Sequence, residues 1–372
     1  MQHDEIMSES VSYLQIAKAL RDEIRNGAYS GSGKFPSLTK IMRRFGVSRP
    51  SAVRSVAELK RMGLVGAKKG CGTFVLKKNR TIGLALPGTA DSDFFSAVMD
   101  GLVFNCQKYG FDMIAGDVFA VDHDRRDAQA EKLARHFAEK KVAGIVMQPV
   151  GFSENADSLN GIISGMLDKA GIPVVLIDYD IVPSPERSRY DLVAIDNFDA
   201  GRKIAAHLLG LGANRICCLL RPLCADSVHV RFAGVDAEVR RSRGRHASVI
   251  IAEPYDARKI AAALDDLRPD AIVCSNDIAA GMLTKTLRKL KVRVPQDVML
   301  AGFDDVEEAA KMKPPLTSMR QPCFELASMA FRTLIERMSN PKLPPRKILL
   351  NTTLVVREST CRRVQPFTGG RE

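Results

Sequence analysis

The sequence predicts an α/β protein in which a small, basic helical module precedes a larger body of two parallel β/α lobes. Charge is concentrated at the start of the chain: residues 1–80 contain 16 Lys and Arg against 6 Asp and Glu, whereas residues 81–372 contain 39 against 37. Short amphipathic segments and a hairpin pattern fill residues 12–76. From residue 81 onward, apolar strand-like runs alternate with helix-length amphipathic segments, which is typical of parallel sheets covered by helices.

The composition limits the classes of protein that remain. The chain has 372 residues, 45% of them hydrophobic, which is enough to fill two or three domains. Its first ten residues are polar, and no run approaches the roughly 18 apolar residues of a spanning helix, so we expect a cytoplasmic protein with no membrane segment. The cysteines lack C-x-x-C spacing and the histidines are scattered, so we expect reduced thiols and no metal site. No G-x-G-x-x-G follows a predicted strand, which argues against a nicotinamide dehydrogenase, and no cofactor is expected.

The basic module is predicted to contain three helices and a hairpin. Apolar residues recur at helical spacing over residues 13–26, and Gly27 ends this helix. Pro36 and Ser37 begin a second helix, which Gly46 ends, and Ser48 is expected to cap a third. The buried face of the third helix is predicted to consist of Val53, Val56, Ala57 and Leu59. Residues 64–75 then have the pattern of a β-hairpin with lysines and glycines at its tip.

Two short helices joined by a tight turn form a helix-turn-helix, a motif that places the N-terminal end of its second helix in the major groove of DNA. Arg49 is the best candidate for a base contact, because a guanidinium can bond O6 and N7 of guanine together. A basic module also gains affinity for a polyanion by releasing counterions. The alternative is a three-helix module whose basic face is merely solvated, but the turn, the cap and the hairpin occur in the order that DNA binding requires.

This module resembles the GntR-type winged helix over its whole length. The matching segments are Tyr13-Leu14-Gln15-Ile16-Ala17, Phe35-Pro36-Ser37, Phe45-Gly46-Val47-Ser48-Arg49 and Gly70-Cys71-Gly72-Thr73-Phe74-Val75. The resemblance implies a recognition helix and a glycine-rich wing near the minor groove or the DNA backbone. The family usually has Arg two places after the Pro-Ser pair, where this chain has Leu38-Thr39-Lys40, so Lys40 is expected to make a phosphate contact instead. The candidate DNA-binding residues are Lys40, Ser48, Arg49, Ser51, Arg54, Lys68, Lys69, Gly70 and Gly72.

The body is predicted to form two similar lobes, because nearly 280 residues exceed one comfortable core. Its predicted strands are residues 82–86, 112–115, 144–148, 174–177, 216–220, 249–251, 271–274 and 298–301. Ligands of open parallel sheets bind beyond the carboxyl ends of the strands. The residues found there include Phe94 and Phe95, Asp178, Asn276 and Asp277, and Asp304 and Asp305, with Arg231 on a helix at the same edge. An aromatic ring, carboxylates, an amide and a guanidinium suit a small polyhydroxylated ligand.

Each of these residues also has a structural interpretation. Asn276 and Asp277 can cap the helix that follows, with Asp277 the stronger candidate, and Phe94 can belong to the core. Asp305 is expected to be structural more than Asp304. Asp178 and Asp304 can also be interpreted as the acid and base of a glycosidase, but a sensor cleft uses the same groups to accept hydroxyl protons, and a DNA-binding module has no purpose on such a hydrolase. The protein is therefore expected not to be an enzyme.

The body resembles the LacI/GalR-type sensor domain, which shares the bilobed fold of periplasmic sugar-binding proteins, over about residues 81–358. The resemblance is carried by Phe94-Phe95, Pro173 to Asp178, Asp196-Asn197 with Ala200-Gly201, Arg231-Phe232-Ala233-Gly234, Cys274-Ser275-Asn276-Asp277 with Ala280-Gly281, Val294 to Val298 through Gly302-Phe303-Asp304-Asp305, and Pro315 to Ser318 with Arg320-Gln321-Pro322. It implies effector contacts from Phe95, Asp178, Arg231, Asn276 and Asp304, with Ile195 and Gln321 near the hinge. The helix-turn-helix and hinge helix of that family are missing here, so operator recognition falls to the winged helix.

These observations together predict a ligand-responsive transcription regulator, a repressor that binds a palindromic operator as a homodimer and a small sugar-like effector between its lobes. We expect the effector to relieve repression. A nucleobase or a phosphorylated metabolite is the alternative effector, because Arg231 also suits a phosphate or a carboxylate. The predicted domains are a winged helix at 10–77, a linker at 78–80, an effector-binding and dimerisation domain at 81–358 and a mobile tail at 359–372.

Overall fold

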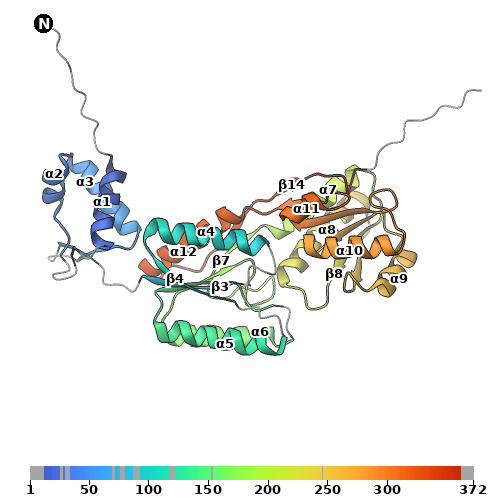
Figure 1. Ribbon diagram of the computed structural model, residues 1–372, viewed down its shortest axis with the longest axis horizontal. Coiled ribbons are helices and arrows are strands. Elements are labelled where there is room, and N and C mark those ends of the chain that lie inside the picture. Colours follow the sequence, from blue (N-terminus) through green and yellow to red (C-terminus); the bar gives the residue numbers. More distant parts are fainter. Residues whose placement is uncertain are drawn as a thin grey trace, which may run out of the picture.

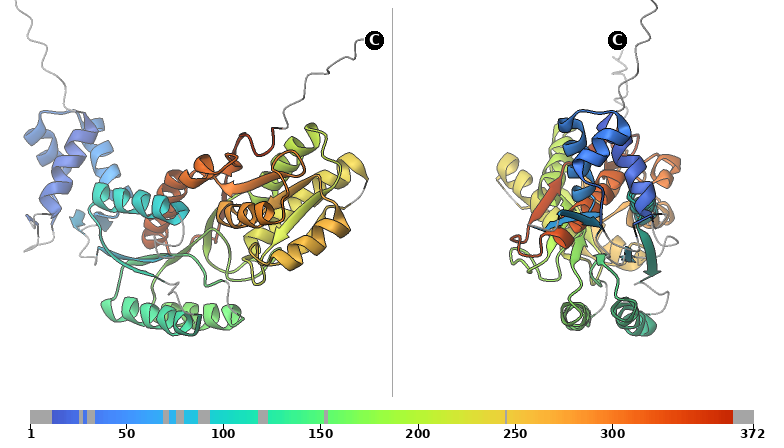
Figure 2. Two further views of the ribbon diagram at one scale, coloured as in Figure 1. Left: turned by 45° about the vertical axis from the view of Figure 1, so that its right-hand side comes forward. Right: turned by 90° about the vertical axis from the view of Figure 1, so that its left-hand side faces the viewer.

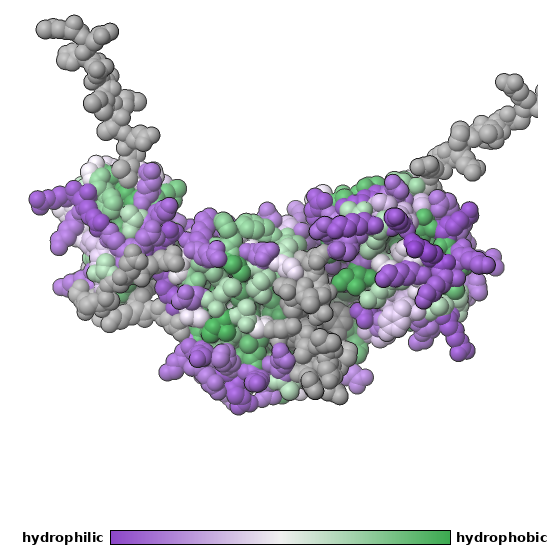
Figure 3. Space-filling view, in the orientation of Figure 1, coloured by the Kyte–Doolittle hydropathy of each residue, from purple (hydrophilic) through white to green (hydrophobic). Residues whose placement is uncertain are grey.

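The computed structural model describes residues 12–25, 28–29, 34–68, 72–75, 80–86, 93–117, 123–151, 154–244 and 246–361. Within these ranges a small N-terminal unit lies against one end of an elongated body, and the body has two lobes side by side (Figure 1). Figure 3 shows hydrophilic residues gathered on the N-terminal unit and on the lower helices of the first lobe, with more hydrophobic residues over the helix between them. No helix in the described part of the chain is long and apolar enough to cross a membrane.

The N-terminal unit is a winged helix. It contains α1 (Tyr13–Arg25), α2 (Leu38–Phe45), α3 (Arg49–Arg61), β1 (Val65–Lys68) and β2 (Gly72–Val75). The Ser37 side chain caps α2 by accepting from the backbone N–H of Lys40, and Gly46 ends α2 in the left-handed region at φ 63°. Strands β1 and β2 pair antiparallel, and the N–H of Phe35 donates to the carbonyl of Thr73 at 3.1 Å. The wing is thus attached to the segment that leads into the helix-turn-helix.

The buried face of α3 differs from the predicted one. The buried residues are Ala52, Ser55, Val56 and Leu59. Val53 is 45% exposed and Ala57 is also exposed, so the prediction was wrong for these two residues. Positions 52, 55, 56 and 59 follow one helical stripe, and the small side chain at its start allows α1 and α2 to approach α3 closely. Hydrophobicity alone identified the helix but not which way it faces.

The first lobe has a six-stranded parallel sheet in the order β13-β7-β6-β5-β3-β4, in which β13 (Lys347–Leu350) comes from near the end of the chain. Its elements are β3 (Thr81–Leu86), α4 (Asp93–Tyr109), β4 (Asp112–Asp117), α5 (His123–Lys140), β5 (Gly144–Met147), α6 (Ala156–Lys169), β6 (Val174–Ile177) and β7 (Asp191–Ile195). Helices α5 and α6 lie side by side below the sheet, and α4 lies on its opposite face (Figures 1 and 2). Apolar side chains from both faces fill the lobe.

The second lobe repeats this architecture in the order β14-β12-β11-β10-β8-β9, with only β12 and β14 pairing antiparallel. Its elements are α7 (Asn197–Gly210), β8 (Ile216–Leu220), α8 (Asp226–Arg243), β9 (Ser248–Ile251), α9 (Ala257–Leu267), β10 (Ala271–Cys274), α10 (Asp277–Lys289), β11 (Met299–Asp304), α11 (Glu307–Lys311) and β12 (Thr317–Arg320). The carboxyl ends of β6 and β11 lie where the two lobes meet, which brings the predicted effector residues to their junction.

The chain crosses between the lobes three times. It leaves the first lobe between β7 and α7, and it returns between β12 and α12 (Cys323–Ser339), which packs on α4 and on the first sheet. It then adds β13 (Lys347–Leu350) to the first sheet and β14 (Thr353–Val355) to the second. Three short crossings at one edge form a hinge about which two rigid lobes can close.

Three of the eight predicted strands have the bounds expected for them, and the other five differ by one to three residues at an end. The sequence analysis did not identify β7 and β12, which lead into crossings between the lobes, or β13 and β14, which form one edge of each sheet. The predicted tail boundary at 359 was also wrong: Ser359 and Thr360 are buried, and the Ser359 hydroxyl donates to the carbonyl of Leu300 at 2.6 Å. Residues 362–372 of that tail, and 78–79 of the predicted linker, lie outside the described residues.

Candidate functional site

The recognition helix presents an exposed surface at its N-terminal end. Arg49 and Arg54 are exposed, and Arg49 lies in the first turn of α3. Ser48 occupies the N-cap position but makes no capping hydrogen bond; its hydroxyl lies 3.2 Å from the Oγ of Ser51. Both hydroxyls therefore belong to the exposed end of the helix and have hydrogen-bonding capacity left for a phosphate or a base edge.

The remaining predicted DNA contacts surround this helix end. The Lys40 side chain is exposed on the first turn of α2. Gly72 begins β2 at φ 80°, opposite Lys68 of β1, so the wing tip lies between them. The Lys68 side chain, Lys69 and Gly70 lie outside the described residues. Arg44 forms an ion pair with Glu23 and so serves the module rather than DNA.

One exposed residue of α3 was missed by the sequence analysis. Val53 lies one helical turn after Arg49 on the exposed side of the helix. An apolar side chain at this place can contact the methyl group of thymine in the major groove. The signal that identifies it is the burial of Ala52 and Val56, which turns position 53 outward.

On the first lobe, the candidate effector site is built around Asp178, the residue after β6. It is held at φ 75°, which turns its carboxylate away from the strand direction. Gln148, after β5, is 3% exposed and donates from Nε2 to Asp178 Oδ2 at 2.9 Å. Burial raises the pKa of Asp178, while the charge of Arg231 and hydrogen bonds from Gln148 and Ser227 oppose this rise. The Oε1 atom of Gln148 is buried and accepts no hydrogen bond within the described chain.

On the second lobe, Arg231 is the central cation. It is 3% exposed, and its Nε and Nη2 donate to Asn197 Oδ1 at 3.1 and 2.9 Å. Its Nη1 donates to the carbonyl of Ser275, and its guanidinium carbon lies 4.1 Å from the centroid of the Phe303 ring. Burial lowers its pKa, and the charges of Asp304, Asp178 and Asp277 oppose this. The protein thus fixes the guanidinium plane before any ligand binds.

Asp304 and Gln321 complete this side. Asp304 ends β11 at φ 105°, and Gln321 donates from Nε2 to its Oδ1 at 2.6 Å. Burial raises the pKa of Asp304 to about 7, opposed by Arg231 and by the Gln321 hydrogen bond. Gln321 lies in the crossing from β12 to α12, so it connects a ligand-facing carboxylate to the hinge.

Asn276, not Asp277, caps the helix that follows them. Asn276 caps α10 by accepting from the N–H of Ala279 at 2.9 Å. Asp277 is fully buried and accepts from the Ser318 hydroxyl at 2.7 Å and from the N–H of Val306 at 3.1 Å. The expectation that Asp277 would be the stronger capping candidate was wrong, and the Asn276 amide nitrogen is the part of that side chain left to face a ligand.

Of the remaining predicted residues, some belong to the core and others lie at the candidate site. Phe94 is 6% exposed and belongs to the core, and Phe95 is half-buried beside it with ring centroids 4.7 Å apart. Asp305 forms ion pairs with Arg320 and Arg357 at 2.6 Å each, so its structural role is confirmed. Ile195 is 2% exposed at the end of β7.

A cavity of about 160 Å³ opens beside the hinge. Its lining comes from both lobes and includes Asp178, Ile195, Asn197 and Ser227. Gln148, Ser227 and Asn197 were missed as site residues, although Gln148 follows a predicted strand and so satisfied the rule that identified Asp178. Within the described ranges, no group of three His, Cys, Asp or Glu side chains is placed to hold a metal ion.

Two regions of the chain match protein families. Residues 12–75 match the bacterial regulatory proteins of the gntR family, and residues 205–360 match the periplasmic binding protein-like domain. The HTH-type transcriptional repressor PurR of Vibrio atlanticus (strain LGP32) is 28% identical over 288 residues, which cover 75% of this chain and 81% of the relative. The ribose operon repressor of Escherichia coli (strain K12) is 25% identical over 295 residues, which cover 76% of this chain and 83% of the relative.

Solved structures show the same fold. The LacI family transcriptional regulator from Enterococcus faecium with bound ribose has a TM-score of 0.61 at 24% identity, covering 75% of this chain and 98% of that one. Both sequence relatives named above are repressors.

Proposed function

Because the chain joins a gntR-type helix-turn-helix domain to a periplasmic-binding-protein-like domain of the LacI type, we propose that it is a repressor that a small sugar-like effector releases from its operator. The winged helix binds a palindromic site as part of a homodimer, in which two-fold symmetry places two recognition helices on two half-sites. Because the proposed operator lies on DNA inside the cell, we also propose a cytoplasmic location. We assign DNA binding to residues 10–77, the linker to 78–80 and effector binding with dimerisation to 81–360.

One observation supports effector binding most strongly: buried polar groups from both lobes lie close enough where the lobes meet to shift each other's pKa. Asp178 and Gln148 come from the first lobe, and Arg231 and Asp304 come from the second. A ligand bonded to both sets draws the lobes together, because its contacts are complete only in the closed form. The Gln148 Oε1 is buried without a hydrogen bond, so a donor on the ligand can satisfy it. The carboxylates of Asp178 and Asp304 can accept further hydrogen bonds from the ligand.

A sugar satisfies this set better than an apolar metabolite does. Each hydroxyl donates one hydrogen bond and accepts others, so it can donate to a carboxylate and accept from Arg231. The half-buried Phe95 can cover an apolar sugar face. Ribose is bound in the related Enterococcus faecium structure, and one relative is a ribose operon repressor, which is consistent with this ligand class.

The DNA part of the proposal is tested by titrating the full-length protein onto DNA from upstream of its own gene at several salt concentrations. We expect protection of a palindrome, with affinity that falls steeply as salt rises. A scrambled palindrome of the same composition is the control. Equal affinity for both sequences would contradict operator recognition while leaving the effector proposal intact.

The effector part is tested by a thermal-shift screen of pentoses, hexoses and their acids. One compound is expected to raise the melting temperature, because a ligand that binds only the folded state stabilises it by mass action. Asp178→Ala is expected to abolish the shift, whereas Arg258→Ala, an exposed cation on α9, should keep it. An undiminished rise in melting temperature in the Asp178 variant would show that the effector binds outside this cleft.

A nucleobase is the second candidate effector, favoured by the Gln148 amide, whose Nε2 donates to Asp178 and whose Oε1 accepts no hydrogen bond within the described chain. Adenine, guanine and hypoxanthine therefore belong in the same screen. A rise in melting temperature with a nucleobase and with no sugar would show that the effector is a nucleobase, and the proposed cleft would remain the binding site.

A further inference from the structure

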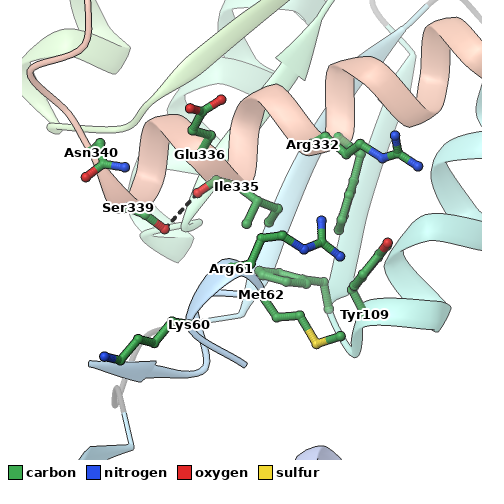
Figure 4. A pocket seen from close by; sticks show the side chains of 11 residues that line it. Lys60, Arg61, Met62, Tyr109, Arg332, Ile335, Glu336, Ser339 and Asn340 are labelled. Atoms are coloured by element: carbon green, nitrogen blue, oxygen red, sulfur yellow. Dashed lines mark hydrogen bonds between the residues drawn. The ribbon is translucent and has the colours of Figure 1, made fainter. Parts of the chain in front are cut away.

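A second pocket lies far from the hinge, where the winged helix meets the first lobe. Its volume is about 520 Å³, which lies within the ordinary range for small-molecule sites. Figure 4 shows Arg61 and Met62 reaching this space from the end of α3, while Arg332 and Ile335 line it from α12. Both domains therefore form its walls.

The floor of this pocket is aromatic and apolar. The rings of Tyr109 and Phe331 stack with centroids 5.4 Å apart, and the edge of Phe111 meets Phe331 at 5.6 Å. Met62 and Ile335 are each less than 9% exposed and close the sides. The three buried rings meet partly face to face and partly edge to face, and a further aromatic body can pack against such a cluster in the same offset or edge-on geometries.

The rim is cationic. Lys60, Arg61 and Arg332 line it, and its carboxylate, Glu336, is already bound to Arg346 at 2.7 Å. Arg61 pairs with Glu58, but Lys60 and Arg332 have no carboxylate partner among the residues that the structure describes. Two uncompensated cations above an apolar floor favour an amphipathic anion over a neutral or cationic molecule.

We propose that this interdomain pocket is a second small-molecule site, separate from the sugar cleft, and that it takes a planar aromatic carboxylate. The aromatic body lies on the floor of Tyr109, Phe111 and Phe331, and the carboxylate pairs with Arg332. A ligand in this place touches the recognition-helix domain and the sensor domain at once. Its occupancy therefore affects how the winged helix is held.

The test uses 2-naphthoate as the probe and 2-naphthylmethylamine as its matched cation. The chain contains no Trp, so naphthalene fluorescence anisotropy can be followed with the full-length protein without Trp background. We expect saturable binding of the acid and none of the amine. No saturable binding of the acid at millimolar concentration, or equal binding of both probes, would overturn the proposal.

Variants locate the bound probe. Arg332→Ala should weaken 2-naphthoate about fivefold or more, because it removes a charge-assisted hydrogen bond, and Arg332→Lys should retain most of the affinity. Ser339→Phe fills the pocket from its exposed rim and should abolish binding. Arg258→Ala on the second lobe and Asp304→Asn in the sugar cleft should bind as the wild type does. Unchanged affinity in both Arg332→Ala and Ser339→Phe would place the probe elsewhere and disprove the site.

Discussion

The buried guanidinium of Arg231 is held in one orientation, which suits it to recognise a ligand by geometry as well as by charge. Three of its donor contacts go to Asn197 and to the Ser275 carbonyl, and its plane lies on Phe303. We predict that Arg231→Lys weakens the effector by roughly 1.5–3 kcal/mol, because an ammonium cannot reproduce the planar fork. Calorimetric titration checks this, with Arg258→Lys as the control. An affinity unchanged by Arg231→Lys would mean that only charge matters at this position.

Asp304 gives the site a pH dependence. In the unfolded chain its carboxyl titrates near 4, whereas in the folded protein burial raises its pKa to about 7. The folded state therefore holds a proton between about pH 4 and pH 7 that the unfolded state releases. This contribution to stability is complete below about pH 4 and is lost as the pH rises through about 7.

We therefore predict that Asp304→Asn loses less stability than the wild type between pH 5 and pH 8, by about 1 kcal/mol or more. Urea unfolding at both pH values measures the difference. Arg231, Asp178 and Asp277 lie near this carboxyl, and the charge of Asp304 helps to raise the pKa of Asp277, so Asp304→Asn also reduces the pH dependence that Asp277 contributes, in the same direction. Parallel pH profiles for the two proteins would contradict the assignment of this proton to Asp304.

The residue types of the cleft were readable from the sequence, but their individual tasks were not. Asp178, Arg231 and Asp304 follow strands or lie beside them, so position along the chain was enough to identify them. Whether Asn276 or Asp277 caps α10 depends on the side-chain rotation that Ser318 imposes through its hydrogen bond to Asp277. Ser318 lies 41 residues further on, and no local pattern carries that information.

At the scale of elements, α7 and α8 are held unusually close. A Cβ on Gly201 would meet the carbonyl oxygen of Arg231, and a Cβ on Gly234 would meet that of Phe198. In each helix, the glycine therefore lies directly against the backbone of the other helix. This reciprocal contact positions the helix that carries Arg231.

We predict that Gly234→Ala destabilises the protein by about 1–3 kcal/mol or more, because a backbone carbonyl cannot move aside as a side chain does. It should also weaken the effector, since α8 must shift. Gly161→Ala in α6 is the matched control: nothing lies within 4 Å of its Cβ, and alanine is the better helix former. Chemical unfolding of both variants checks this, and equal stabilities would refute the close-contact interpretation.

The two helices of the DNA-binding motif are predicted to contribute in different ways. Lys40→Ala should weaken operator and random DNA alike and reduce the salt slope by about 1, because it removes a phosphate contact. Arg49→Ala should weaken the operator by roughly 1–3 kcal/mol and random DNA less, because it removes a base contact. Anisotropy titrations on both DNAs at several salt concentrations distinguish the two. Identical effects of the two substitutions would contradict these separate roles.

The strands that the sequence did not reveal lie next to the crossings between the lobes. β13 and β14 are edge strands that pair with β7 and β12 from much earlier in the chain, whereas β7 and β12 are interior strands that lead into the crossings. Interior strands such as β6 are apolar on both faces and therefore stand out. The exposed residues at alternate positions of β13 remove that signal.

For the whole molecule, the arrangement links two sites through one lobe. The winged helix rests on the ends of α4 and α12, and α12 begins at the crossing that carries Gln321 (Figure 1). In the proposed repressor, we expect closure of the lobes to change the crossings and thereby the position of α12. Effector and operator are then expected to oppose each other by the same factor in either direction, typically about 5–150-fold.

A direct contact between the winged helix and the first lobe is made by Arg21 of α1, whose Nη1 donates to the carbonyl of Lys108 at the end of α4 at 2.6 Å. Arg21 faces the sensor domain, so its removal leaves both binding sites intact. We predict that Arg21→Ala keeps the separate affinities for operator and effector within about twofold but brings their coupling factor several-fold closer to one, as expected for a residue on the physical path between sites. Operator titrations with and without saturating effector measure this factor, and Arg258→Ala serves as the control. Full coupling in the Arg21 variant would show that the signal reaches the winged helix by another route, of which the Arg61 contact with Tyr109 is the next to test.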